Sequence, residues 1–218
     1  MIRRIWKRLT SLVAPKKHLN LTDYWHDRAR QYGKRSVLNL AHSEEEFDKV
    51  TDYQKQFLFP LLKFELNGTE SSILDFGCGP GRFTLGLAEL INGPATGVDI
   101  SPELLEHAPK SSSVSYQSIG AGSALPFCDS SFDVVWSCLV LGTIPDSQIE
   151  QSIAEIERVL RPGGLFFYVE NTANNANLPY FTFRDVDTYI RLAAFCQPKV
   201  LDCYLDMEEQ ITIFAGRK

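Results

Sequence analysis

The feature that most constrains this chain is a glycine-rich loop placed directly after a short apolar segment. Residues 73–82 read Ile-Leu-Asp-Phe-Gly-Cys-Gly-Pro-Gly-Arg. The apolar run predicts a buried strand over residues 72–76, with Asp75 near its carboxyl end. A helical pattern begins at Arg82. Between the two lie glycines that let a ligand approach the bare backbone, namely Gly77, Gly79 and Gly81.

A second acid strengthens this interpretation. The next apolar segment, residues 95–99, ends in Asp99, which lies 18 residues beyond Gly81. An acid at that distance from a glycine loop is typical of a group that binds the two hydroxyls of a ribose. The pair of acids therefore predicts a nucleoside-binding α/β domain.

The loop also indicates the charge of the ligand. It contains G-C-G-P-G rather than the G-x-G-x-x-G of dinucleotide-binding loops. A pyrophosphate needs converging backbone N–H groups, and Pro80 lacks one. Asp75 places a negative charge nearby. This arrangement favours a cationic ligand and argues against an NAD-dependent oxidoreductase.

The remaining pattern alternates strands with helices, which predicts a parallel sheet covered on both faces. At 218 residues the chain suits one domain with a sizeable core. Further strands are expected at 114–119, 132–138 and 164–170, with helices at 82–91, 102–107 and 148–160. The end of the chain predicts a helix over 184–196 and two strands, Lys199–Leu205 and Gln210–Ala215.

The N-terminal part predicts two helices before the first strand. Thr22 or Asp23 can cap a helix that Gly33 ends. Ser43-Glu44-Glu45-Glu46 has the form of a capping box and begins a longer helix. Pro60 should kink or shorten that helix.

Several motifs in order resemble the class I S-adenosylmethionine-dependent methyltransferases. D-F-G-C-G-P-G matches their first motif. The resemblance continues through Gly97–Ser101, Leu125-Pro126-Phe127, Ser131–Val135 and Arg158–Gly164, so it covers residues 72–171. It implies a Rossmann-like, seven-stranded, mostly parallel sheet with helices on both faces, closed by an antiparallel C-terminal hairpin. It also implies S-adenosyl-L-methionine as the cofactor.

The expected organisation is a tail over 1–20 followed by a single methyltransferase domain over 21–218. Within that domain we expect an N-terminal helical lid (21–70), a cofactor-binding core (71–171) and a C-terminal helix with a strand pair (172–218).

The resemblance assigns cofactor roles to particular residues. Asp75 would hold the methionine ammonium, the three glycines would supply backbone contacts, Asp99 would bind the ribose, and Ile100 would pack on the adenine. Family members often have an acid that reads the adenine amino group where this chain has Ala121. Adenine recognition would then rely on backbone groups around Ala121 and Gly122, or on Ser123. On the first helix, Arg28 is expected to pair with the methionine carboxylate and Trp25 to exclude water.

A general base is harder to identify. Glu170, at the end of the fifth predicted strand, and His26, beside Trp25, are the candidates, with Asp185 as a third. Glu170 has the alternative role of binding loop backbone, and His26 that of a packing residue. Because neither is compelling, a non-catalytic cofactor-binding protein stays open. No cluster of histidines and carboxylates has the spacing of a metal site.

The acceptor is expected to be a small molecule or a glycan. No Asn-Pro-Pro-Tyr motif follows the fourth strand, which argues against nucleic-acid bases and protein amides; Asn177-Leu178-Pro179-Tyr180 follows the fifth. The net charge of −5 also disfavours a nucleic-acid partner. Tyr24–Ala29 and Glu170-Asn171-Thr172 are similar to a subgroup of bacterial glycan pathways. This resemblance points to a sugar hydroxyl; a quinone or another secondary metabolite is the alternative.

The first residues differ from the rest of the chain. Residues 1–20 contain six basic residues and no acid, and apolar residues recur at helical spacing over 1–13. This pattern suits a helix on an anionic membrane surface, a docking segment or a solvated tail. The chain has no 18-residue apolar run, and its five cysteines form no C-x-x-C pair. We therefore expect a cytoplasmic protein, with the tail as a candidate for contact with the inner membrane face.

Overall fold

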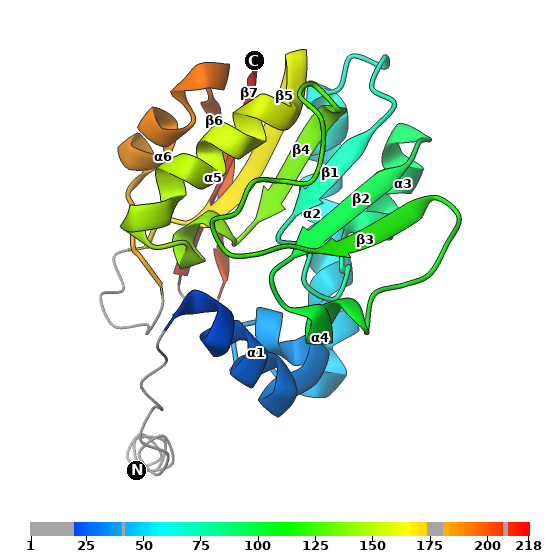
Figure 1. Ribbon diagram of the computed structural model, residues 1–218, viewed down its shortest axis with the longest axis vertical. Helices are drawn as coiled ribbons and strands as arrows, with labels where there is room; N and C mark the ends of the chain where they lie inside the picture. The colour runs from blue at the N-terminus through cyan, green and yellow to red at the C-terminus, as the bar shows by residue number, and fades with distance from the viewer. Residues whose placement is uncertain (1–19, 41, 174–180, 207–208) are drawn as a thin grey trace.

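The computed structural model describes residues 20–40, 42–173, 181–206 and 209–218. Its centre is one seven-stranded sheet in the order β3-β2-β1-β4-β5-β7-β6 (Figure 1). The predicted tail over 1–13 and the Asn177–Tyr180 segment lie outside the described residues. The strands are β1 (Ile73–Phe76), β2 (Ala95–Asp99), β3 (Val114–Ser118), β4 (Phe132–Cys138), β5 (Leu160–Asn171), β6 (Lys199–Asp206) and β7 (Glu209–Arg217).

The pairing of these strands confirms the expected fold class. β1 pairs in parallel with both β2 and β4, and β2–β3 and β4–β5 are parallel as well. β7 runs antiparallel to β5 and to β6, so the last two strands form the predicted hairpin. Strand order reverses beside β1, because the chain moves outward to β2 and β3 and then returns to β4. Open α/β sheets bind ligands at such a switch point.

Two hydrophobic layers hold helices against the sheet. Leu74 and Phe76 point to one face, where α5 (Asp146–Val159) and α6 (Val186–Leu192) pack. Ile73 points to the other, where α2 (Phe47–Glu65) and α3 (Thr84–Ile91) pack. Figure 1 shows the two pairs of helices on opposite sides of the strands. Because alternate side chains of a strand face opposite ways, β1 contributes to both layers.

The helix ends follow local capping rules, with two differences from expectation. Helix α1 (Leu21–Tyr32) ends at Gly33 as predicted, but its cap is Asn20, whose side chain accepts from the Asp23 N–H. The Asp23 side chain is therefore inside the first turn. The capping box at Ser43 is confirmed, with α2 following the short 3-10 helix Glu44–Glu46 (η3). α2 is not shortened by Pro60, which lies inside it.

The remaining segments complete the edge at which the parallel strands end. α1 lies at that edge, together with the short helix α4 (Pro102–Leu105) and the 3-10 helix η2 (Gly33–Val37), as Figure 1 shows for the two labelled helices. Over the described ranges, no helix combines the length and the hydrophobicity that crossing a bilayer requires.

Candidate functional site

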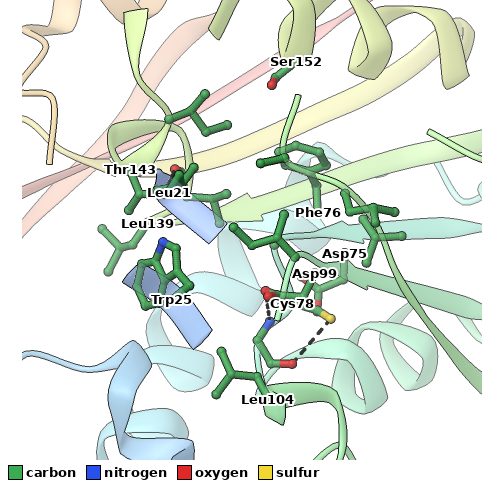
Figure 2. Close-up of a pocket in the computed structure, with 18 of the residues that line it drawn as sticks. Leu21, Trp25, Asp75, Phe76, Cys78, Asp99, Leu104, Leu139, Thr143 and Ser152 are labelled. Carbon is green, nitrogen blue, oxygen red and sulfur yellow. Dashed lines mark hydrogen bonds between the residues drawn. The ribbon is translucent and has the colours of Figure 1, made fainter. Parts of the chain in front are cut away.

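A cavity that is open to solvent at its mouth lies where β1, β2 and β4 end. Figure 2 shows Trp25 of α1 on one side of it and Asp75, Asp99 and Cys78 on the other. Five of the residues proposed from the sequence do not line it: Gly81, Arg28, His26, Glu170 and Asp185. The others all do, namely Trp25, Asp75, Gly77, Gly79, Asp99, Ile100, Ala121, Gly122 and Ser123.

The backbone amides of the glycine loop are used within the fold. The N–H groups of Gly77 and Cys78 both donate to the Val98 carbonyl, at 2.8 and 3.0 Å. The Gly79 N–H donates to Asp99 Oδ2 at 2.8 Å, and the Gly81 N–H to the Cys78 carbonyl at 3.0 Å. Pro80 has no N–H. The loop therefore does not present a set of free amides to a phosphate.

Glycine is required in this loop because neighbouring side chains crowd the backbone. At Gly77, with φ of +74°, a Cβ atom would lie 2.4 Å from Val140 Cγ2. At Gly79, with φ of +54°, it would lie 2.9 Å from Val37 Cγ1. Both positions would also strain an L side chain. The glycines thus let η2 and the segment after β4 close on the loop.

Gly81 has a different role from the one expected. A Cβ atom there would lie 2.8 Å from Pro109 Cδ and 2.8 Å from the Tyr116 hydroxyl. These neighbours belong to the packing around β3, on the side of the loop that does not line the cavity. The absence of a side chain at Gly81 permits this packing, and the residue does not line the cavity.

Asp75 is a buried carboxyl group in the wall of the cavity. The Thr84 hydroxyl, in the first turn of α3, donates to Asp75 Oδ2 at 2.6 Å. Burial raises the pKa of Asp75 to about 7, against the opposing effect of that hydrogen bond. A cation bound beside it would favour the ionised form.

Asp99 both shapes the loop and faces the cavity. Its Oδ2 accepts the Gly79 N–H and its Oδ1 accepts the Ser101 N–H, each at 2.8 Å. Burial raises its pKa, and these backbone donors oppose the shift. A carboxylate oxygen accepts more than one hydrogen bond. Both oxygens therefore retain capacity for hydroxyl groups of a ligand.

The segment that follows β3, residues 119–123, forms another wall of the cavity. Ile119, Gly120, Ala121, Gly122 and Ser123 all line it. Ser123 Oγ donates to the Gly120 carbonyl at 2.7 Å, which uses its only hydrogen. Ala121 offers no side-chain acceptor. The residues that the sequence analysis proposed for adenine recognition therefore present mostly backbone and apolar surface to this end of the cavity.

Comparison with known proteins agrees with this arrangement. A family model described as a methyltransferase domain matches residues 73–164, which include the glycine loop, both acids and β4. Residues 73–164 therefore match a methyltransferase domain, in agreement with the resemblance to the class I S-adenosylmethionine-dependent methyltransferases. The cofactor of that family is S-adenosylmethionine.

The curated relatives of this chain are named for different acceptors. Malonyl-[acyl-carrier protein] O-methyltransferase of Herminiimonas arsenicoxydans is 28% identical over 76% of this chain and 62% of that protein. Demethylmenaquinone methyltransferase of Staphylococcus aureus is 34% identical over 50% of this chain and 45% of that protein. The chain thus aligns with less than two thirds of the length of these relatives.

Solved structures agree on the fold. Phosphoethanolamine N-methyltransferase 2 from Haemonchus contortus, in complex with S-adenosyl-L-methionine, has a TM-score of 0.68 at 17% identity. The match covers 94% of this chain and 61% of that one. At such identity the likeness concerns the fold alone.

Arg28 does not line the cavity. Its guanidinium donates to the carbonyls of Ser36 and Leu38, at 2.6 and 3.3 Å, and to the Tyr24 hydroxyl at 3.2 Å. These contacts hold the chain after α1 in place. Arg28 therefore lies outside the lining of the cavity, and its pairing with a methionine carboxylate stays a prediction, whereas Trp25, one turn away on α1, does line the cavity.

Glu170 is not placed as a base. It is fully buried in β5, and its carboxylate accepts the N–H groups of Val140, Leu141 and Gly142 at 3.1, 2.8 and 3.0 Å. Burial raises its pKa to about 7, while the three amides oppose the shift. Because Val140 lines the cavity, Glu170 positions one of its walls.

His26 and Asp185 also have structural partners. His26 Nε2 lies 3.1 Å from the Ile100 carbonyl, and its Nδ1 lies 3.9 Å from Glu103 Oε1. These contacts join α1 to the end of β2 and to α4. Asp185 caps α6 by accepting the Thr188 N–H at 2.8 Å. None of the three base candidates therefore lines the cavity.

Arg82 is the basic residue that the sequence analysis did not assign to the site. It is the one Lys or Arg among the described residues that line the cavity. Its guanidinium donates to Thr51 Oγ1 at 3.1 Å and to Gln54 Oε1, both buried on α2. Thr51 and Gln54 lie in the buried stripe of α2, whose other members are apolar. Two polar residues in an otherwise apolar stripe are the sequence signal that could have indicated a buried hydrogen-bonding partner such as Arg82.

Acidic, histidine and cysteine side chains do not gather elsewhere in the described chain. No group of three or more of them could hold a metal ion within those residues.

The five cysteines are all free, and burial raises the pKa of Cys138 in the cavity wall to about 12.

Proposed function

We propose that the protein binds S-adenosyl-L-methionine in this cavity and transfers its methyl group to a small-molecule acceptor. One observation carries the proposal: the buried Asp75 and the partly buried Asp99 lie beside a glycine loop whose own amides are already bonded. A phosphate would find no free cluster of donors there, whereas a cationic amino acid with a ribose would find acceptors.

In this proposal the ammonium group of the cofactor lies beside Asp75, and Asp99 accepts from the ribose hydroxyls. Arg82 takes the role of carboxylate partner that the sequence suggested for Arg28. Only two of the five N–H donors of a guanidinium are used by Thr51 and Gln54. The adenine lies at the end of the cavity that is lined by Ile100 and by the segment after β3, which includes Ala121.

Transfer needs alignment more than proton chemistry. The sulfonium of the cofactor supplies an activated methyl group, so the chain has to orient the acceptor and exclude water. We assign closure to the lid of residues 21–70, through Trp25, over a core of residues 71–171. The C-terminal segment, 172–218, completes the sheet. Since no base candidate lines the cavity, a hydroxyl acceptor would have to lose its proton to water or to another group of the acceptor itself.

The acceptor we favour is a hydroxyl group of a sugar, on the similarity of Tyr24–Ala29 and Glu170–Thr172 to glycan-pathway enzymes. The demethylmenaquinone methyltransferase relative supports a quinone as the second candidate. The non-catalytic alternative, cofactor binding without transfer, is the third possible outcome of the test below.

Calorimetry with S-adenosylhomocysteine and with NAD tests binding first. We expect the former to bind and the latter not to bind. Replacing a charge-assisted acceptor in Asp99→Asn should weaken S-adenosylhomocysteine about tenfold to hundredfold. Tighter binding of NAD would contradict the proposal. Release of S-adenosylhomocysteine is then measured with sugar nucleotides, glycans, quinols and phenols; turnover with none of them would favour the non-catalytic alternative.

We also propose that residues 1–13 contact anionic membranes, on their basic and apolar pattern. Anionic vesicles should retain the full-length protein at low salt and release it at high salt. A chain starting at Lys16 should not be retained. Equal retention of both chains would exclude this role.

A further inference from the structure

One buried acceptor in the cavity wall has no partner. Gln148, in the first turn of α5, lines the cavity, and its Oε1 atom is buried without a hydrogen bond. Several other described side chains contain buried polar atoms without partners, but none of those residues lines the cavity. A buried acceptor of this kind costs free energy unless a donor reaches it. The donor for Gln148 is therefore sought in the ligand.

The position of Gln148 identifies the part of the ligand that it meets. A Cβ atom built on Gly122 would lie 3.3 Å from Gln148 Cδ and 3.4 Å from its Oε1. The amide thus packs against the backbone of the segment after β3. This segment, with Ala121, is the adenine end of the cavity in the proposed function.

The carboxylate that lines the same end of the cavity is already engaged. Glu155 lines the cavity, but its Oε2 accepts the Leu125 N–H at 2.6 Å and Arg158 at 2.7 Å. Its Oε1 accepts Arg158 Nε at 2.9 Å. Ser123 is an exposed residue whose hydroxyl donates to the Gly120 carbonyl, and Ala121 replaces the acid expected there.

We propose that Gln148 Oε1 accepts the exocyclic amino group of the cofactor's adenine and so replaces the acid missing at position 121. The inference rests on the proposed function, because it requires an adenine nucleoside in the cavity. Gln148 is then a specificity residue supplied by α5 rather than by the segment after β3. The side-chain amide also carries N–H donors, which suits the adjacent ring nitrogens of adenine.

The test compares two ligands that differ only at the amino group. These are S-adenosylhomocysteine and its 6-deamino analogue, in which hydrogen replaces the amino group. Calorimetry on the parent protein should show the amino group tightening binding about tenfold or more, since its loss leaves Oε1 unpaired. In Gln148→Met, which keeps the volume but removes the acceptor, the ratio should fall to within about twofold of one.

Two further variants sharpen the comparison. Gln148→Glu retains an acceptor and should retain the preference for the amino group. Gln151→Met, on an exposed position of the same helix, should bind both ligands as the parent does. Because each protein is judged by a ratio of two affinities, a general loss of stability does not imitate the effect.

The outcomes separate the two proposals. A parent protein that binds S-adenosylhomocysteine but shows the same ratio as Gln148→Met would overturn the role of Gln148 alone. A parent that does not bind S-adenosylhomocysteine would overturn the proposed function and, with it, the role of Gln148.

Discussion

The Thr84 hydroxyl donates to a carboxylate oxygen of Asp75 at 2.6 Å, and both side chains are buried. Thr84 begins α3 and Asp75 lies in β1, so the bond spans the glycine loop from strand to helix. It gives the carboxyl group a donor but no counter-charge. Burial consequently dominates and raises the pKa of Asp75 to about 7.

Ligand binding should therefore release a proton from Asp75. The folded protein keeps a proton that the unfolded chain loses near the ordinary pKa of 3.8, so this group lowers stability as pH rises from about 4 to about 7. A bound ammonium favours the carboxylate, and S-adenosylhomocysteine should bind more tightly as pH rises towards 7. Calorimetry at pH 6 in buffers of different ionisation enthalpy measures the released proton.

Two variants check the assignment of that proton. Asp75→Asn should remove most of the release, although Asp99 and Glu170 also have raised pKa values. Thr84→Val removes a group that lowers the pKa of Asp75, so the release should move to higher pH. An unchanged release in Asp75→Asn would assign the proton to another group.

Gly79→Ala should weaken binding of S-adenosylhomocysteine, because the new Cβ would lie 2.9 Å from Val37 Cγ1 and displace η2 or the loop. Gly163→Ala is the matched control: its φ is +76°, and nothing lies within 4 Å of its Cβ. Both variants should lose about 1–2 kcal/mol of stability from backbone strain. Thermal unfolding measures that loss, and calorimetry should show weaker binding for Gly79→Ala alone.

Arg82→Met should lower the free energy of unfolding by about 1–3 kcal/mol, because the buried Gln54 acceptor loses its donor. It should also weaken S-adenosylhomocysteine binding, since Arg82 lines the cavity. Urea unfolding and calorimetry measure the two effects. Arg191→Met, on the exposed face of α6, should change neither. Full stability in Arg82→Met would mean that the α2 contacts contribute nothing.

Glu170→Gln should lower stability and shift the segment after β4, and it should not remove a general base. A glutamine can accept fewer than the three amide hydrogen bonds that the carboxylate accepts, so about 1–3 kcal/mol of stability should be lost. Once an acceptor is found, the pH profile of turnover should keep its shape. Disappearance of its acidic limb in this variant, but not in the exposed Glu150→Gln, would restore Glu170 as a base.

Local patterns along the chain determined the fold and the centre of the site. Apolar runs, glycines and caps act within a few residues, and the parallel strands they predict bring Asp75 and Asp99 to one edge. The glycine loop follows its strand directly, so Gly77 and Gly79 reached the cavity as expected. Even here the choice among neighbouring caps was decided by backbone geometry, which selected Asn20 over Thr22 and Asp23.

Only the tertiary structure decided which polar side chains are free to meet a ligand. Glu170 was matched with amides about 30 residues earlier in the chain, and Arg82 with Gln54 of α2, which packs on the same face of the sheet as α3. Arg28 was used by nearby carbonyls, while Gln148 was left without a partner. A side chain's role depends on which donors and acceptors remain after packing has paired the others. That balance is set by contacts between distant residues, and no spacing in the sequence contains it.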